Sequence, residues 1–189
     1  MELYRVILAA GLVIHKLVWE VLRPQAAKGR ERSMGISPIV VLIKFVKLCI
    51  LAFLVFQSLF LQLMPITNDP SGLRVIGLCL FGSGLGIAIL GRIQLGENWV
   101  DLEEYQVVPG QALVTKGIYG YVRHPIYAGD ILLLIGLQLA LNYWLVIAAM
   151  IPAAVAVRNV QAEEKILVRA FPGYAEYRCR TKKFIPFVF

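Results

Sequence analysis

Charged residues are scarce in this sequence. Only 16% of its 189 residues are charged, whereas 59% are hydrophobic. A soluble domain of ordinary composition carries about 25% charged residues, so this chain has too little charge to cover a solvated surface. The composition excludes a typical soluble domain and indicates a protein that uses the lipid bilayer as its solvent. A single membrane domain over residues 1–189 fits the length.

Residues that bind metals or form disulfides are also few. The sequence has two histidines and three cysteines, and Cys49, Cys79 and Cys179 show no CxxC or other metal-ligand spacing. Cys49 and Cys79 fall inside apolar stretches, where cysteine acts as a small hydrophobic side chain. We therefore expect no metal site and no disulfide.

The basic residues are not gathered into one stripe. The net charge is +7, but the lysines and arginines lie between and after the apolar stretches. This distribution argues against nucleic acid as a partner and favours contact with membrane lipid headgroups. The glycines of GLCLFGSGLGIAIL follow no strand pattern, so they predict close helix packing and not a nucleotide-binding loop.

The apolar stretches predict an all-α integral membrane protein with five transmembrane helices. A bilayer core needs about 20 helical residues. The first stretch has no basic region before it and no cleavage site after it, so we expect a span and not a signal peptide. The last apolar run, residues 126–157, is too long for one span and predicts a helical hairpin. The expected spans are residues 3–22, 38–64, 72–95, 126–141 and 144–157.

The charges of the loops predict the orientation in the membrane. Residues 23–37 carry four basic residues, whereas residues 65–71 carry none. Lysine and arginine are retained on the cytoplasmic side, so the first loop is expected inside and the N-terminus outside. Residues 96–125 and the tail 158–189 then both face the cytoplasm, and the aromatic and basic tail predicts an interfacial helix.

Two short motifs flank the last two expected spans. RHPIY, residues 123–127, precedes the fourth span, and its proline suits the first turn of a helix, where free backbone N–H groups can receive an anionic group. Glu163 and Glu164 follow the fifth span. Adjacent residues on a helix point about 100° apart, so only one of the two carboxylates is expected to face a shared site, and both could equally lie on a solvated face.

Taken in order, these segments resemble the isoprenylcysteine carboxyl methyltransferase family. The resemblance covers roughly residues 91–189 and rests on LVTKGIY, RHPIY, the glutamate pair and the aromatic tail FPGYAEY with the later IP. It implies a membrane methyltransferase that uses S-adenosylmethionine and releases S-adenosylhomocysteine. It also implies a cytoplasmic loop that binds this cofactor. The cofactor-binding residues it implies are Glu104, Gln111, Ala112, Leu113, Val114, Tyr119, His124, Pro125, Ile126, Tyr127 and Glu163.

The implied acceptor is lipophilic, a small molecule or a prenylated cysteine whose carboxylate receives the methyl group. Some family members carry an arginine for that carboxylate where this sequence has Asn159, and Arg158 lies one residue earlier. An amide cannot replace a bidentate arginine contact. Either Arg158 reaches the site by a local adjustment, or the acceptor is not a prenylcysteine carboxylate. The candidate catalytic residues that the resemblance implies are Arg158, Asn159 and Arg123.

Three other functions remain open from the sequence. Membrane sterol and enone reductases that use NADPH share an RHPxY-like stretch and an aromatic ending. A methyltransferase acting on a phospholipid amine would use the same cofactor. A non-catalytic membrane scaffold is the third, whereas the absence of an inverted repeat argues against a secondary transporter.

Overall fold

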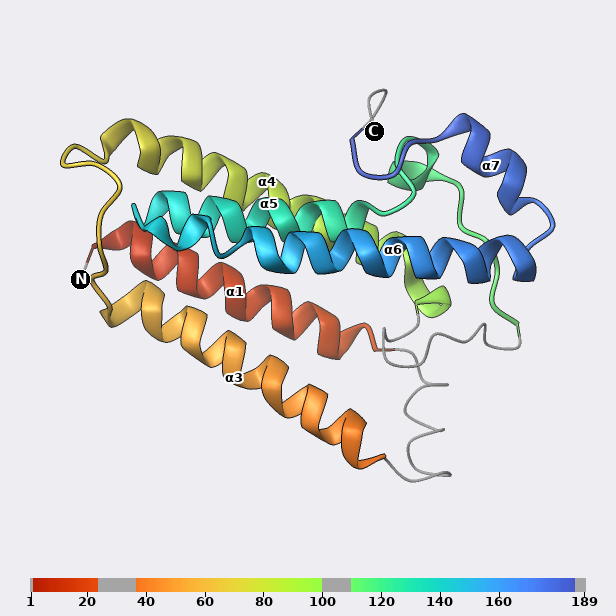
Figure 1. Ribbon diagram of the computed structural model, residues 1–189, viewed down its shortest axis with the longest axis horizontal. Coiled ribbons are helices and arrows are strands. Elements are labelled where there is room, and N and C mark those ends of the chain that lie inside the picture. Colours follow the sequence, from red (N-terminus) through yellow and green to blue (C-terminus); the bar gives the residue numbers. More distant parts are fainter. Residues whose placement is uncertain (1, 24–36, 100–109, 186–189) are drawn as a thin grey trace.

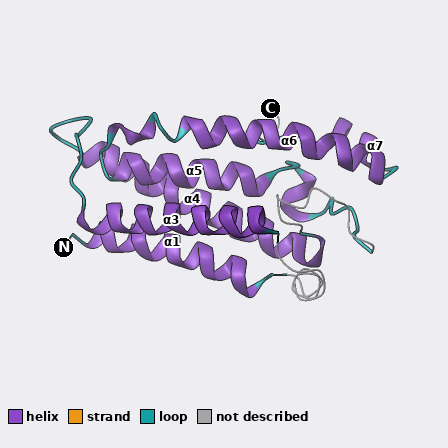
Figure 2. Cartoon of the chain, turned by 60° about the horizontal axis from the view of Figure 1, so that its bottom comes forward, coloured by secondary structure: helices purple, strands orange, loops and turns teal. Residues whose placement is uncertain are grey.

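The computed structural model describes residues 2–23, 37–99 and 110–185, and these ranges fold into helices without a strand (Figures 1 and 2). The prediction of an all-α protein is confirmed for them. The long helices are α1 (Leu3–Val21), α3 (Pro38–Phe60), α4 (Ser71–Leu95), α5 (Pro125–Ala140) and α6 (Met150–Ala170), followed by the short α7 (Tyr174–Arg180). Three 3₁₀ turns are η1 (Gly96–Asn98), η2 (Gly117–Gly120) and η3 (Trp144–Val146).

Successive long helices run in opposite directions along the bundle (Figure 1). The connections 61–70 and 141–149 therefore lie at one end, and Pro65 pairs with Tyr143 in an isolated bridge there. Residues 110–124 and α7 lie at the other end. The two regions that carry the sequence motifs thus share one end of the molecule, as the loop charges predicted.

Three helical segments of the described residues are long and apolar enough to cross a membrane, namely Pro38–Phe60, Ser71–Asn98 and Trp144–Ala170. Helix α5 is apolar but shorter. Helix α3 exposes a row of large apolar side chains, among them Phe45 and Phe53, which suits contact with lipid. An apolar membrane fold is present, and the count of five spans stays a prediction.

Several predicted bounds differ from the structure. The second helix ends at Phe60, because Leu61 is extended and Pro65 begins the bridge to Tyr143. The last span was expected at residues 144–157, but Trp144–Val146 is a 3₁₀ turn and α6 continues to Ala170. The apolar run stops at Val157, whereas good helix formers such as glutamate, glutamine and leucine carry the helix onward. The glutamate pair therefore lies on the same helix as the fifth span.

Helices α4 and α5 pack closely because glycines face each other across their contact. A Cβ added at Gly77 would lie 2.2 Å from the backbone N of Ala140, and one added at Gly136 would lie 2.3 Å from that of Phe81. Small residues let helix backbones approach where lipid offers no hydrophobic drive for packing. This pair fixes the position of the N-terminus of α5, on which the candidate site is built.

The end opposite the motifs is closed by hydrogen bonds. Asn142 has a φ of 62°, and its side-chain oxygen accepts hydrogen bonds from the backbone N–H groups of Ile66 and Thr67 at 3.2 and 3.1 Å. Arg5 donates to the carbonyls of Ser58 and Leu61 and to the hydroxyl of Tyr143. The two connections at that end are thereby held together.

Candidate functional site

A cavity of about 790 Å³ opens at the end of the bundle that carries the motifs. Its lining comes from six helices, from η1 and η2, and from the loop before η2. The implied cofactor-binding residues within the described chain all lie on it: Gln111, Ala112, Leu113, Val114, Tyr119, His124, Pro125, Ile126, Tyr127 and Glu163. Residues separated by more than fifty positions in the sequence thus border one space.

The RHPIY segment forms the start of α5. Pro125 is the first helical residue and His124 is the N-cap, with φ −127° and ψ 59°. This backbone lies outside the α-helical region, which a residue before proline avoids. The backbone N–H groups of Arg123 and His124 donate to the carbonyls of Lys182 and Lys183 at 2.8 and 3.0 Å. The C-terminal segment therefore holds the helix start in place.

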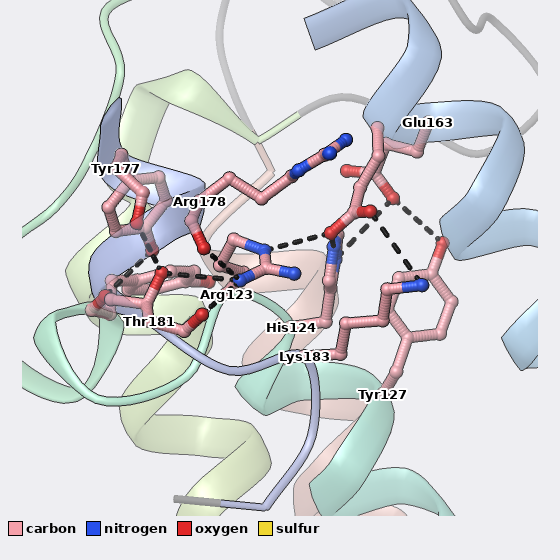
Figure 3. Close-up of polar contacts among 10 residues, drawn as sticks. Arg123, His124, Tyr127, Glu163, Tyr177, Arg178, Thr181 and Lys183 are labelled. Carbon is pink, nitrogen blue, oxygen red and sulfur yellow. Dashed lines mark hydrogen bonds and ion pairs between the residues drawn. The ribbon is translucent and has the colours of Figure 1, made fainter. Parts of the chain in front are cut away.

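Arg123 and Glu164 form a buried ion pair beside this helix start (Figure 3). The guanidinium Nε donates to Glu164 Oε1 at 2.8 Å, and Nη1 donates to the carbonyls of Arg178 and Thr181. The two side chains are 6% and 8% exposed. A buried charge is tolerated when it is paired and hydrogen-bonded. Arg123 thus ties α5, α6 and the C-terminal segment together, and its guanidinium is already engaged.

Glu163 has a different environment from its neighbour. Its side chain is 36% exposed and lines the cavity, while the hydroxyl of Tyr127 donates to its Oε2 at 3.2 Å (Figure 3). His124 Nδ1 lies 4.0 Å from the same oxygen. One carboxylate of the pair therefore faces the cavity while the other is buried against Arg123, as the 100° offset predicted.

The ring of His124 is buried between these groups and is only 4% exposed. Its Nε2 lies 3.4 Å from Glu164 Oε1, but within the described residues this nitrogen makes no hydrogen bond. The ring of His124 therefore lies between the carboxylates of Glu163 and Glu164.

The loop before η2 is fixed by Asn98. The backbone N–H of Ala112 donates to Asn98 Oδ1 at 2.6 Å, and Gln111 Nε2 donates to the backbone carbonyl of Asn98 at 2.9 Å. Nearby, the guanidinium of Arg92 lies 4.6 Å above the ring of Trp99. These contacts place the loop 111–114 and an aromatic ring on the same wall of the cavity.

The turn η2 depends on one glycine. Gly117 has a φ of 64°, and an added Cβ would lie 2.2 Å from Gln94 Oε1. The same oxygen accepts a hydrogen bond from the backbone N–H of Ile118 at 2.8 Å. Only glycine adopts this conformation readily, so the turn that presents Tyr119 to the cavity requires it.

Tyr119 is itself held from two sides. Its hydroxyl donates to the carbonyl of Gly91 at 3.2 Å, and its carbonyl accepts from the hydroxyl of Tyr177 at 2.7 Å. Burial raises the pKa of Tyr119, and it raises the pKa of Tyr177 to about 12. Both phenols therefore keep their protons at neutral pH and remain hydrogen-bond donors.

A sequence profile of the phospholipid methyltransferase family matches residues 73–173. The chain belongs to this family. The match contains the glycine-packed pair α4 and α5, the loop 111–114, RHPIY and the glutamate pair. The matched residues therefore include some of the elements that border the cavity, but not α1, α3 or α7.

Two curated proteins are similar to part of the chain. The cobalt-zinc-cadmium resistance protein CzcN of Cupriavidus metallidurans is 33% identical over 109 residues, which are 54% of this chain and 46% of that protein. The protein-S-isoprenylcysteine O-methyltransferase of Schizosaccharomyces pombe is 28% identical over 116 residues, 56% of this chain and 49% of that protein. The chain spans about half the length of these curated relatives.

The fold agrees with these relatives. The structure of a eukaryotic intramembrane Ras methyltransferase, an isoprenylcysteine carboxyl methyltransferase, superposes with a TM-score of 0.62 at 22% identity, over 93% of this chain and 63% of that one. The resemblance to the isoprenylcysteine carboxyl methyltransferases is confirmed at the level of family and fold.

Two of the candidate catalytic residues lie elsewhere. Arg158 is exposed on α6 and Asn159 is half-buried, and neither is part of the cavity lining. Arg123 does border the cavity, with its guanidinium engaged as described. Glu104 falls outside the described residues. The structure therefore gathers the implied cofactor residues without bringing Arg158 or Asn159 to them.

A second polar group of the cavity was not among the site residues predicted from the sequence. His15 of α1 and Asp130 of α5 both line it and lie 2.9 Å apart. The available signal was an ionisable residue inside an apolar run, IYAGDILLL, because such residues are rare within membrane helices and often functional. Only the fold could pair it with a histidine 115 positions away.

Proposed function

We propose that this protein is an integral membrane methyltransferase that transfers a methyl group from S-adenosylmethionine to a lipophilic acceptor. The acceptor we propose is the carboxylate of an isoprenylcysteine or a similar lipid-like thioether acid. One observation carries the proposal: the loop 111–114, the RHPIY helix start and Glu163 border one cavity. The family and the two methyltransferase relatives support it.

The residues present fit S-adenosylmethionine. The volume of about 790 Å³ falls within the range of small-molecule sites. The ligand is a cation at sulfur, and the lining offers the carboxylate of Glu163 together with the rings of Trp99 and Tyr119. Carboxylates and aromatic faces both attract cations.

When bound, S-adenosylmethionine supplies a methyl group on a positively charged sulfur. The chain's own residues then orient the two partners. Glu163, Tyr127 and the loop 111–114 line the cavity, while Leu48 and Leu51 of α3 add apolar surface for a lipid chain. Because displacement requires the acceptor in line with the sulfur–methyl bond, positioning and exclusion of water supply most of the rate enhancement.

We further propose that the N-terminus lies outside the cell and that the cavity and the C-terminus face the cytoplasm. Basic residues concentrate at the cavity end, with Lys16, Arg23, Lys44 and Lys47 in the lining, which the positive-inside rule favours. A water-soluble cofactor would then reach the cavity from the cytoplasm, and the acceptor would reach it from the bilayer.

A second acceptor class has its own support. The family is described by phospholipid methylation, so the amine of a phospholipid headgroup is the alternative to a carboxylate. The two acceptors share a lipid chain and differ in the reacting atom. Parallel assays with a farnesylcysteine acid and with phosphatidylethanolamine distinguish them, because only the true acceptor gains a labelled methyl group.

The first experiment is calorimetric binding of S-adenosylmethionine and, separately, NADPH to the purified protein in detergent. We expect binding of S-adenosylmethionine alone. Binding of NADPH alone would replace the proposal with the reductase function, and binding of neither would favour a non-catalytic membrane protein.

Glu163→Gln tests the carboxylate at the cavity wall. Hydrogen bonds to charged groups contribute about 1.5–3 kcal/mol, so we expect the Kd for S-adenosylmethionine to rise at least about tenfold. Glu176→Gln is the control, since Glu176 is exposed on α7 and pairs with Arg180. If the Glu163 variant binds as tightly as the control, the proposed role of Glu163 is wrong.

A further inference from the structure

The cavity also carries an acid–base pair that is not among the implied cofactor residues. His15 Nε2 lies 2.9 Å from Asp130 Oδ1, and the imidazole stacks on Trp19 with ring centroids 4.0 Å apart. Asp130 sits four residues after Ile126, so it lies about 6 Å, one helical turn, further along α5 than the RHPIY start. The pair therefore borders the same cavity as the cofactor residues.

His15 differs from His124 in its access to a ligand. The His15 side chain is 24% exposed and that of Asp130 is 42% exposed, whereas His124 is 4% exposed. A residue that exchanges a proton with a bound acceptor must be reachable from the cavity. His15 meets this requirement and His124 does not.

A carboxylate bonded to one ring nitrogen prepares the other for proton transfer. When Nε2–H donates to Asp130, Nδ1 carries the free electron pair, and the carboxylate then stabilises the imidazolium that forms. The stacked Trp19 ring restricts rotation of the imidazole. This arrangement makes His15 a positioned general base.

An acceptor that arrives through the bilayer needs such a base. Moving an ionised carboxylate from water into an apolar medium costs far more than moving the neutral acid. A lipid-borne acid therefore enters in its protonated form, whose oxygen is a poor nucleophile. A base inside the cavity would generate the carboxylate next to the methyl group.

We propose that His15, held by Asp130, accepts the proton of the acceptor acid. This inference rests on the proposed methyl transfer. The acceptor O–H bond breaks and its proton moves to Nδ1 of His15. The carboxylate oxygen then forms a bond to the methyl carbon while the carbon–sulfur bond breaks and its electron pair stays on sulfur. The proton finally leaves His15 for water, so the products are a methyl ester, S-adenosylhomocysteine and H⁺.

Other charged groups surround the pair and must be considered in any titration. The lining near it includes Lys16 and Glu20 of α1, which bond to each other at 2.5 Å, together with Lys44 and Lys47 of α3, Tyr127 of α5 and Glu163 of α6. A direct readout of the imidazole itself is therefore needed.

Nuclear magnetic resonance of ¹⁵N-histidine protein gives that readout, because the chain has only two histidines and His15→Gln identifies their signals. We expect a farnesylcysteine acid, added with S-adenosylhomocysteine, to move the His15 nitrogens to imidazolium shifts. Its methyl ester should leave them unchanged. Equal spectra with bound acid and bound ester would overturn the proposal.

Kinetics supply the second test. His15→Gln can still bond to Asp130 but cannot accept a proton. We expect kcat to fall on the order of 10²-fold or more, with the affinity for S-adenosylmethionine unchanged within about twofold. The acidic limb of the pH–rate profile should disappear. Gln138→Ala, which breaks the buried bond to Gln57 on α3, is the control for a purely structural loss and should keep that limb.

Different results would contradict the role of His15 and the proposed methyl transfer itself. A wild-type protein that binds S-adenosylmethionine and methylates the acid, with a His15→Gln variant of equal rate and pH profile, would overturn the role of His15 alone. A wild-type protein that binds no S-adenosylmethionine would overturn both.

Discussion

The two faces of helix α5 have different roles: one packs against α4, and the other borders the cavity. On one face Gly129 and Gly136 let the backbone of α4 approach until no side chain fits between them. On the other face Tyr127 and Asp130 border a cavity. The first face gains stability from contact and is intolerant of added volume. The second face makes fewer packing contacts and carries polar groups. Polar groups within membrane helices are rare and are usually functional.

The comparison predicts where substitutions affect folding and where they affect binding. Changes on the packed face should lower the free energy of unfolding. Ligand binding and activity should then fall as well, because less of the protein is folded. Changes on the cavity face should alter ligand affinity or rate with a smaller effect on stability. Substitutions of residues on neither face should have little effect on stability or on ligand binding.

Gly136→Ala should have the largest effect. The added Cβ would lie 2.3 Å from the backbone N of Phe81, and a backbone cannot move aside as a side chain can. Overpacking costs typically 1–3 kcal/mol, so we expect a clear drop in the unfolding temperature in detergent. Gly82→Ala, with no atom within 4 Å of the new Cβ, is the matched control. Equal melting of the two variants would show that α4 and α5 are not packed through these glycines.

Gly117→Ala should have an intermediate and more local effect. Its φ of 64° costs an L-residue about 1–2 kcal/mol, and the Cβ would collide with Gln94. If that strain is released by displacing η2 and Tyr119, the affinity for S-adenosylmethionine should fall about fivefold or more, as measured by calorimetry. Gly173→Ala, at a residue with φ −80° and open space around its Cβ, should bind normally. Normal binding by both variants would place η2 outside the cofactor site.

Arg158→Ala should have the smallest effect. Arg158 is exposed and outside the cavity lining, and such surface changes usually stay within about 0.5 kcal/mol. We expect the KM for a farnesylcysteine acid to change less than about twofold. A large rise in this KM, with unchanged cofactor affinity, would instead mean that α6 turns to bring Arg158 to the acceptor, as the sequence analysis predicted.

Much of the site was predictable from local sequence. Pro125 marked the start of α5 because proline fits only the first turn of a helix. The offset between Glu163 and Glu164 followed from helix geometry. The end of the last span was not predictable from hydropathy, because α6 stays helical after its apolar run ends at Val157. Arg123 was expected near an acceptor, but only the fold provides the carbonyls of Arg178 and Thr181 that engage it.

The sequence by itself indicated that the protein lies in a lipid bilayer, where most of its helices form, and which segments carry polar residues for a functional site. Apolar runs, helix-start residues and family motifs are local properties, so they can be read without knowing which segments lie next to each other in the fold. The tertiary structure decided which polar groups share a space. The bond between His15 and Asp130 joins residues 115 positions apart, and no local pattern encodes such a meeting. It depends on how α1 and α5 are placed in the bundle.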